Sequence, residues 1–112
     1  MKVLLLILGI LSTSNAYSGF VSGTPTQVMK SDYGVHLVYV NFQEPIEKGN
    51  CDSGNGVVIL DSNESSEAAL PMALAAYASK KKFQCYVGGE CSRITGALTT
   101  FPVCIEYPSI TD

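Results

Sequence analysis

Residues 61–83 are DSNESSEAALPMALAAYASKKKF, and this stretch decides the fold because it holds the one clear helix pattern of the chain. Polar residues that cap helices come first, an apolar run follows, and a run of lysines closes it. Within the apolar run, several side chains recur at the spacing of one helix face. They are Leu70, Ala73, Leu74, Tyr77 and Ala78. The spacing predicts that this face is buried against the rest of the protein.

Pro71 leaves the start of this helix open. Proline is tolerated in the first turn of a helix but not in its interior, where its ring removes a backbone hydrogen bond. We therefore expect either a regular helix from residue 70 to about residue 80 or 81, or an earlier turn from about residue 66 that runs into it with a kink.

The other patterned segments are strand-like. Residues 35–42, VHLVYVNF, are dense in β-branched and aromatic side chains and form the strongest strand. Its two faces are both apolar, so it is predicted to be covered on both sides or to reach an interface. Weaker or shorter strands are expected over residues 17–30, 56–60, 83–87 and 98–107. We expect Gly88 to break the fourth strand and Pro108 to end the last one.

The resulting order, β-β-β-α-β-β, is the element order of the OB-fold. The sequence therefore predicts a mainly β domain with one helix, in the form of an OB-fold-like five-stranded barrel that the helix plugs on one side. The side chains expected in its core are Leu70, Leu74, Tyr77, Val38, Val40, Val58 and Ile105.

The first sixteen residues have the pattern of a signal peptide. Lys2 precedes the apolar run VLLLILGIL, and Ser14 and Ala16 place small residues before a cut at Tyr17. We expect residues 1–16 to be removed, which leaves residues 17–112 as one OB-fold-like domain, secreted or periplasmic. No later stretch approaches the roughly 20 apolar residues that a membrane span needs.

Four cysteines, Cys51, Cys85, Cys91 and Cys104, follow the predicted signal peptide. An even number of cysteines in a small exported domain predicts two disulfides. A zinc site is the rival interpretation, and it needs closely paired cysteines or a cluster of cysteine and histidine. The chain has a single histidine and no such pair, so we expect no metal and no cofactor.

The four cysteines allow three pairings. Cys51–Cys91 with Cys85–Cys104 is favoured, because the first two lie in Gly-rich polar loops and the last two lie within strands that are expected to pair. A bridge between facing residues of neighbouring strands satisfies the geometry of a disulfide. The alternatives are Cys51–Cys85 with Cys91–Cys104, and a tight Cys85–Cys91 loop.

Catalytic motifs do not stand out. His36 lies within a strand, and the chain has no G-x-S-x-G segment that would present a nucleophilic serine. Asp61 and Asn63 begin like a calcium-binding loop, but Ser66 and Met72 occupy the places where that loop needs glycine and glutamate. We therefore expect no enzyme and no catalytic residue.

The charge and the aromatic content limit the classes of partner that we expect. The formal net charge is −3, and the one lysine run, residues 80–82, suits the C-terminus of a helix, so nucleic acid is not an expected partner. The chain has six tyrosines and no tryptophan. Tyrosines at this density are typical of strand packing and also of surfaces that contact sugars or proteins.

Three segments carry a resemblance to a known family: GNCDSGNGVVI (residues 49–59), ALPMALAAYASKKKF (69–83) and GGECSRI (88–94). With the element order and the signal peptide, they resemble small exported OB-fold proteins of Gram-negative bacteria, such as the subtilase-cytotoxin and pertussis-like B subunits of A-B pentamer toxins. The resemblance implies a non-catalytic module that binds a glycan or a protein and assembles into a homo-oligomeric ring.

No glycan-binding motif of those toxins matches this chain residue by residue, so the sequence leaves the ligand-binding residues unknown. The alternative is an envelope or secreted structural or inhibitor protein that shares the fold, because a fold alone does not determine a function.

Overall fold

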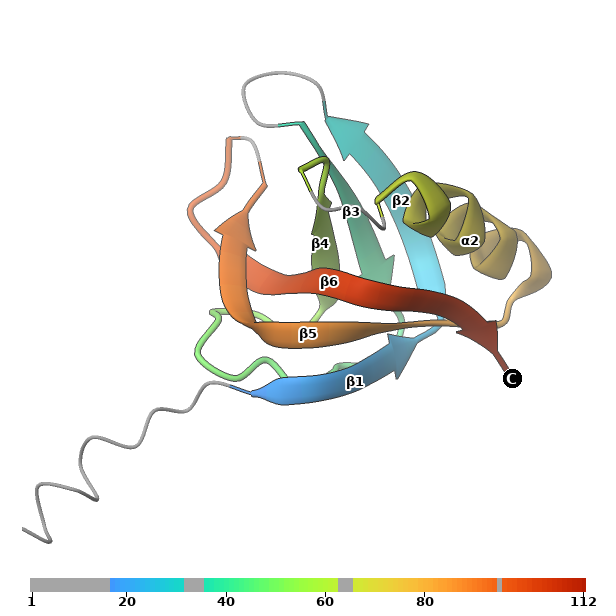
Figure 1. The fold of residues 1–112 in the computed structure, drawn as a ribbon, viewed down its shortest axis with the longest axis horizontal. Helices are drawn as coiled ribbons and strands as arrows, with labels where there is room; N and C mark the ends of the chain where they lie inside the picture. Colours follow the sequence, from blue (N-terminus) through green and yellow to red (C-terminus); the bar gives the residue numbers. More distant parts are fainter. Residues whose placement is uncertain (1–16, 32–35, 63–65, 95) are drawn as a thin grey trace, which may run out of the picture.

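The computed structural model describes residues 17–31, 36–62, 66–94 and 96–112, and the predicted signal peptide lies outside them. Within these residues the chain forms six strands and one helix (Figure 1). The elements are β1 (Ser18–Gly23), β2 (Pro25–Ser31), β3 (Leu37–Phe42), β4 (Gly56–Leu60), α2 (Ser66–Ser79), β5 (Lys82–Arg93) and β6 (Thr100–Thr111). The predicted class, mainly β with one helix, is confirmed.

The described strands form one open sheet of order β1-β5-β6-β4-β3-β2. Neighbouring strands are antiparallel except β4 and β6, which are parallel. The predicted closed barrel of five strands is therefore wrong: the segment expected to be a single first strand is two strands. These two, β1 and β2, follow each other in the chain but lie at opposite ends of the strand order.

The first strand divides at Thr24, where the chain bends. The Thr24 backbone N–H and hydroxyl both donate to the Glu44 carboxylate, at 2.7 and 3.0 Å, and the Thr24 carbonyl accepts from the Gln43 N–H at 2.8 Å. Gly23 precedes the bend, and a Cβ there would come within 2.6 Å of the Phe42 ring. The bend thus needs a glycine and is held by one carboxylate.

This contact makes the stability depend on pH. The hydrogen bond from the Thr24 backbone, opposed by partial burial, lowers the pKa of Glu44 below its usual value of 4.5. A carboxyl whose folded pKa is lowered stabilises the protein above its unfolded pKa, and that contribution is lost as the pH falls through the folded pKa. We expect Glu44→Gln to cost about 1 kcal/mol at pH 7 and much less at pH 3, measured by urea unfolding. Equal losses at both pH values would contradict this role, and Glu90→Gln is the control.

The helix α2 faces the sheet with alanines rather than with its large side chains. Leu74 is 47% exposed and Tyr77 is 49% exposed, and Leu70 is only partly buried, so the predicted helix face is wrong except at Ala73. Small side chains let the helix backbone lie close to the strands, which turns the larger neighbours outward. The buried residues of the helix are Ala69, Ala73 and Ala76.

The helix begins at Ser66 and contains Pro71, the longer of the two predicted alternatives. It ends two residues before the predicted limit because Lys80 adopts a left-handed backbone, with φ 60°. The Lys80 N–H donates to the Tyr77 carbonyl at 3.4 Å and the Lys81 N–H to the Ala76 carbonyl at 3.0 Å. These two bonds form a Schellman cap, which satisfies the last carbonyls of the helix.

The main core lies between α2 and the sheet, and a smaller cluster occupies the other face. Val38, Val40 and Val58 are buried as predicted, whereas Ile105 is only partly buried. The strand β3 contributes to both clusters, which explains why its two faces are apolar. The smaller cluster consists of Leu37, Tyr39, Val58 and Phe101.

The long hairpin of β5 and β6 is irregular in register. Gly88 does not break β5 and Pro108 does not end β6, because bulges absorb both residues within the pairing. The disulfides join Cys51 to Cys91 and Cys85 to Cys104, the pairing that the sequence favours. Two disulfides fit an oxidising extracellular or periplasmic environment.

Candidate functional site

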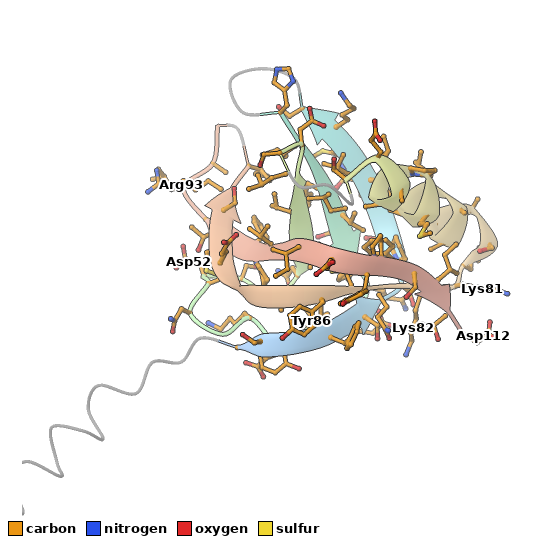
Figure 2. The ribbon with its side chains drawn as sticks, viewed as in Figure 1. Asp52, Lys81, Lys82, Tyr86, Arg93 and Asp112 are labelled. Atoms are coloured by element: carbon orange, nitrogen blue, oxygen red, sulfur yellow. A yellow bond between two sulfur atoms is a disulfide. The ribbon has the colours of Figure 1, made fainter. Side chains whose placement is uncertain are left out.

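Three aromatic rings meet on the face of β1, β5 and β6 that is turned away from the core. Phe20 lies opposite Tyr86 in the strand register, and their ring centroids are 5.4 Å apart in an edge-on arrangement. Tyr107 lies 6.0 Å from Phe20 and 6.3 Å from Tyr86 between centroids. We call these three side chains the aromatic cluster. Figure 2 shows Tyr86 near the boundary between β5 and β1.

The aromatic cluster stays accessible to solvent. Phe20 is 51% exposed and Tyr107 is 59% exposed, and Tyr86 alternates along β5 with the buried residues Cys85 and Val87. The ring separations lie in the range where aromatic pairs attract one another, so the rings support each other on the surface. The cluster is thus an apolar platform held in place by its own contacts.

The backbone of Tyr107 is in the left-handed region, with φ 57°. Tyr107 and Pro108 together oppose the single residue Cys85, which makes a bulge in β6. A left-handed conformation costs an L-residue about 1–2 kcal/mol, and the proline that follows favours an extended residue before it. The bulge turns the Tyr107 ring towards solvent, and the left-handed backbone is the conformational cost of this orientation.

We expect Tyr107→Gly to be more stable than Tyr107→Ala by about 1 kcal/mol, because glycine adopts this backbone without strain. Both variants lack the ring, so the comparison isolates the backbone. Urea unfolding of the two variants measures the difference. An alanine variant as stable as the glycine variant would show that residue 107 is not held in a left-handed conformation.

A row of polar side chains lies beside the aromatic cluster. Ser22, Gln84 and Ser109 stand opposite one another across β1, β5 and β6. Residues that face each other on neighbouring strands project from the same side of a sheet, and this row is two residues along β1 and β5 from the cluster. Glu106, which is exposed, lies opposite Tyr86. Hydroxyl, amide and carboxylate groups therefore border the apolar platform.

A protein-family scan, a search of curated proteins and a search of solved structures all find no match to this chain.

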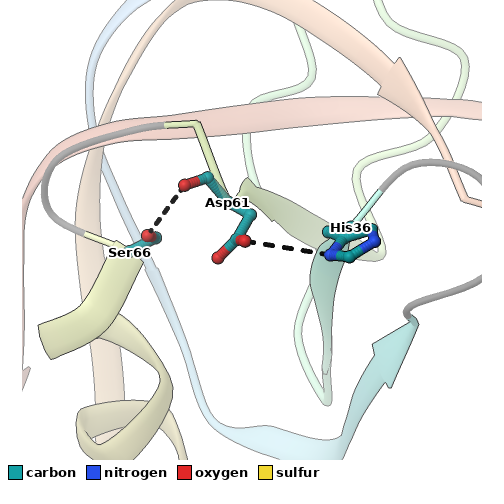
Figure 3. Close-up of polar contacts among 3 residues, drawn as sticks. All are labelled: His36, Asp61 and Ser66. Carbon is teal, nitrogen blue, oxygen red and sulfur yellow. Dashed lines mark hydrogen bonds and ion pairs between the residues drawn. The ribbon is translucent and has the colours of Figure 1, made fainter.

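A second candidate site is a cavity of about 200 Å³ between the start of α2 and the ends of β3 and β4. His36 Nδ1 lies 4.0 Å from the Asp61 carboxylate, and the Ser66 hydroxyl donates to the Asp61 carbonyl at 3.4 Å (Figure 3). The serine proton is thus engaged with a backbone carbonyl at the start of the helix. A catalytic serine would instead offer its proton to the histidine, so this arrangement is that of a helix start.

The Gly-rich loop between β3 and β4 is tied to the end of the hairpin. Cys51 is bonded to Cys91. The Asp52 carboxylate accepts from the Thr100 N–H and hydroxyl, both at 3.1 Å, and the Asp52 N–H donates to the Thr100 hydroxyl at 2.9 Å. These contacts hold the loop against the hairpin, so the bonding groups named here have a structural role.

Two further observations concern metals and membranes. Among the described residues, no group of three or more His, Cys, Asp or Glu side chains gathers in a way that could hold a metal ion. In the same part of the chain, no helix has both the length and the apolar character to cross a membrane.

The sequence left open whether the tyrosines pack between strands or lie on an exposed surface, and the structure contains tyrosines of both kinds. Tyr39 is a packing residue: its ring lies 4.8 Å from that of Phe101, its hydroxyl donates to Asn41 Oδ1 at 2.8 Å, and burial raises its pKa. Tyr107 is instead exposed on the sheet surface, at 59%, and Tyr86 is partly exposed there.

Sequence reasoning missed Phe20 as a member of the site. Phe20 lies in residues 17–30, for which the sequence predicts only one of the weaker or shorter strands. In the run SGFVS, Phe20 is a large apolar side chain on the strand face that it shares with Ser18 and Ser22. This alternation was the one available signal. The pairing of Phe20 with Tyr86 is long-range, so no local pattern could have brought the two together.

Proposed function

We propose that this protein is a non-catalytic, secreted binding module that recognises glycans through the aromatic cluster. A pyranose ring has faces that carry C–H groups and a rim of hydroxyls. An aromatic side chain can bury such a face while the rim stays wet, and it has few rotatable bonds to immobilise. The observation that carries the proposal is the backbone of Tyr107, which is held in a costly conformation that exposes its ring.

The polar row supplies the groups that a sugar rim needs. Ser22 and Ser109 each offer a hydroxyl and Gln84 offers an amide, in one line across the three strands. The exposed carboxylate of Glu106, opposite Tyr86, can accept hydrogen bonds from a ligand. A sugar stacked on the platform would therefore meet both donors and acceptors at its edge.

This proposal agrees with what the resemblance to toxin B subunits implies, a secreted or periplasmic module that recognises a glycan or a protein. A protein ligand would use the same rings as anchors, since tyrosine is enriched at protein interfaces. The polar row suits the glycan, because the hydroxyls around a sugar ring need hydrogen-bond partners close to the stacked face.

The experiment uses the disulfide-bonded chain of residues 17–112. A glycan array identifies ligands, and calorimetric titration with the best monovalent glycan gives its Kd. We expect Phe20→Ala and Tyr107→Gly each to weaken that binding by about 10-fold or more, because each removes one ring of the platform. Tyr107→Gly removes the ring without adding backbone strain.

Tyr77→Ala is the matched control. Tyr77 is also about half-exposed, at 49%, but it lies on α2 and is not part of the aromatic cluster. We expect this variant to bind the glycan as the parent chain does. The absence of any glycan signal, or an equal loss of affinity in Tyr77→Ala, would contradict the proposal.

A further inference from the structure

The helix α2 is apolar on its outer side as well as on its buried side. Twelve consecutive positions, residues 68–79, carry no charged side chain. The buried stripe consists of three alanines, and on the opposite side Pro71, Leu74, Ala75 and Ala78 are all exposed. A surface helix normally turns charged and polar residues to solvent, so a helix that is apolar all round is typical of one covered on both sides.

Charge is confined to the two ends of this outer face. Glu67, in the first turn, is four residues before Pro71 and lies on the same side of the helix. Lys80 and Lys81 follow the last turn. Lys80 and Ala78 line an open hollow between the end of α2 and the bend at Thr24, and Lys81 forms an ion pair with Asp112, with 3.3 Å between Nζ and Oδ1. The acidic and basic ends are about 20 Å apart along the helix axis.

We infer that the outer face of α2 binds the same face of a second copy of this chain, with the two helices antiparallel. That pairing sets Glu67 of each copy beside Lys80 of the other. It also sets Leu74 and Ala75 at the two-fold axis, because these residues lie midway between the charged ends. A parallel pairing would instead bring like charges together, which is unfavourable.

A second copy of this chain matches the outer face of α2 in charge and in apolar character. The overall charge of −3 repels a second copy in general, but the apolar stretch of α2 contributes none of that charge. In an isologous interface both copies use the same surface patch. A helix face with opposite charges at its two ends therefore matches itself only when the two helices run antiparallel. A contact built on one helix is small, so the dimer is expected to be reversible and concentration-dependent.

The first test measures the mass of the chain of residues 17–112 by analytical ultracentrifugation over a range of concentrations. We expect a monomer–dimer equilibrium in the parent chain. Ala75→Glu and Ala75→Lys should each weaken the dimer by about 10-fold or more, because each sets two like charges against the two-fold axis. An equimolar mixture of the two variants should restore the dimer, since opposite charges then meet there.

Leu98→Glu is the matched control, because Leu98 is 80% exposed and lies between β5 and β6, away from α2. It should dimerise as the parent does. A parent chain that stays monomeric at every concentration, or a dimer unaffected by Ala75→Glu, would overturn the inference. So would a pentamer, whose ring contacts would not place Ala75 against itself.

The second test addresses the antiparallel direction. Glu67→Lys and Lys80→Glu should each weaken the dimer by about 5-fold, because each creates two like-charge contacts by symmetry. The combined variant should recover most of that loss. Circular dichroism of each variant confirms that the helix is retained. A combined variant that loses affinity as the sum of the two single losses would show that these ends do not meet.

Discussion

Phe83→Ala should destabilise the protein by about 3–5 kcal/mol, the largest loss expected from a single substitution outside the disulfides. Phe83 is completely buried in the main core. It lies opposite Gly23, which has no side chain to fill space, and the Phe42 ring covers that glycine. Removal of the Phe83 ring therefore leaves a cavity that no neighbouring side chain can fill without moving a strand.

Urea unfolding of this variant and of Phe20→Ala provides the measurement. Phe20 lies three residues before Gly23 in the same strand, but its ring is half-exposed. We expect its loss to cost about 1 kcal/mol or less. Because small domains have stabilities of about 5–15 kcal/mol, Phe83→Ala should still fold. Similar losses in the two variants would show that the two faces of β1 and β5 are misassigned.

Removal of the Cys51–Cys91 disulfide is the second large effect. The double variant Cys51→Ala with Cys91→Ala opens a loop with a sequence separation of 40, and we expect a loss of about 4 kcal/mol from the greater entropy of the unfolded chain. The native loop should keep its place, because Asp52 also binds Thr100 through its carboxylate and its backbone N–H.

The matched comparison is the double variant that lacks the Cys85–Cys104 disulfide. Its sequence separation is 19, so the entropic loss should be smaller, about 3 kcal/mol. Urea unfolding under oxidising conditions gives both values, and the far-ultraviolet circular dichroism should be unchanged in the first variant. The shorter-loop variant also loses the packing of Cys85, which is completely buried. A loss below about 2 kcal/mol for the longer loop would contradict this entropic explanation.

The strongest strands and the presence of two disulfides were predictable from local patterns. The dense apolar segment around Val38 and Val40, and the cysteine positions in loops and strands, each carry a strong local signal. The helix face was not predictable in the same way. Periodicity marks both the buried alanines and the neighbouring large residues, and only the close approach of α2 to the sheet decides which of them is buried.

Two further features of the fold could not be predicted, because both depend on long-range contacts. The division of the first strand at Thr24 depends on Glu44, which lies twenty residues further along the chain. The bulge at Tyr107 depends on the register between β5 and β6, which lets β6 continue past Pro108. For this reason the aromatic cluster, which draws one ring from each of three strands, emerges only from the folded structure.

The most direct test of glycan recognition follows the aromatic rings themselves by nuclear magnetic resonance. Phenylalanine and tyrosine are labelled with ¹³C, and a glycan selected on the array is added in steps. The proposal predicts that the ring signals of Phe20, Tyr86 and Tyr107 shift together with increasing glycan, while those of Tyr39 and Tyr77 stay in place. Saturable shifts centred on Tyr77, or binding that leaves all three rings of the aromatic cluster unchanged, would contradict it.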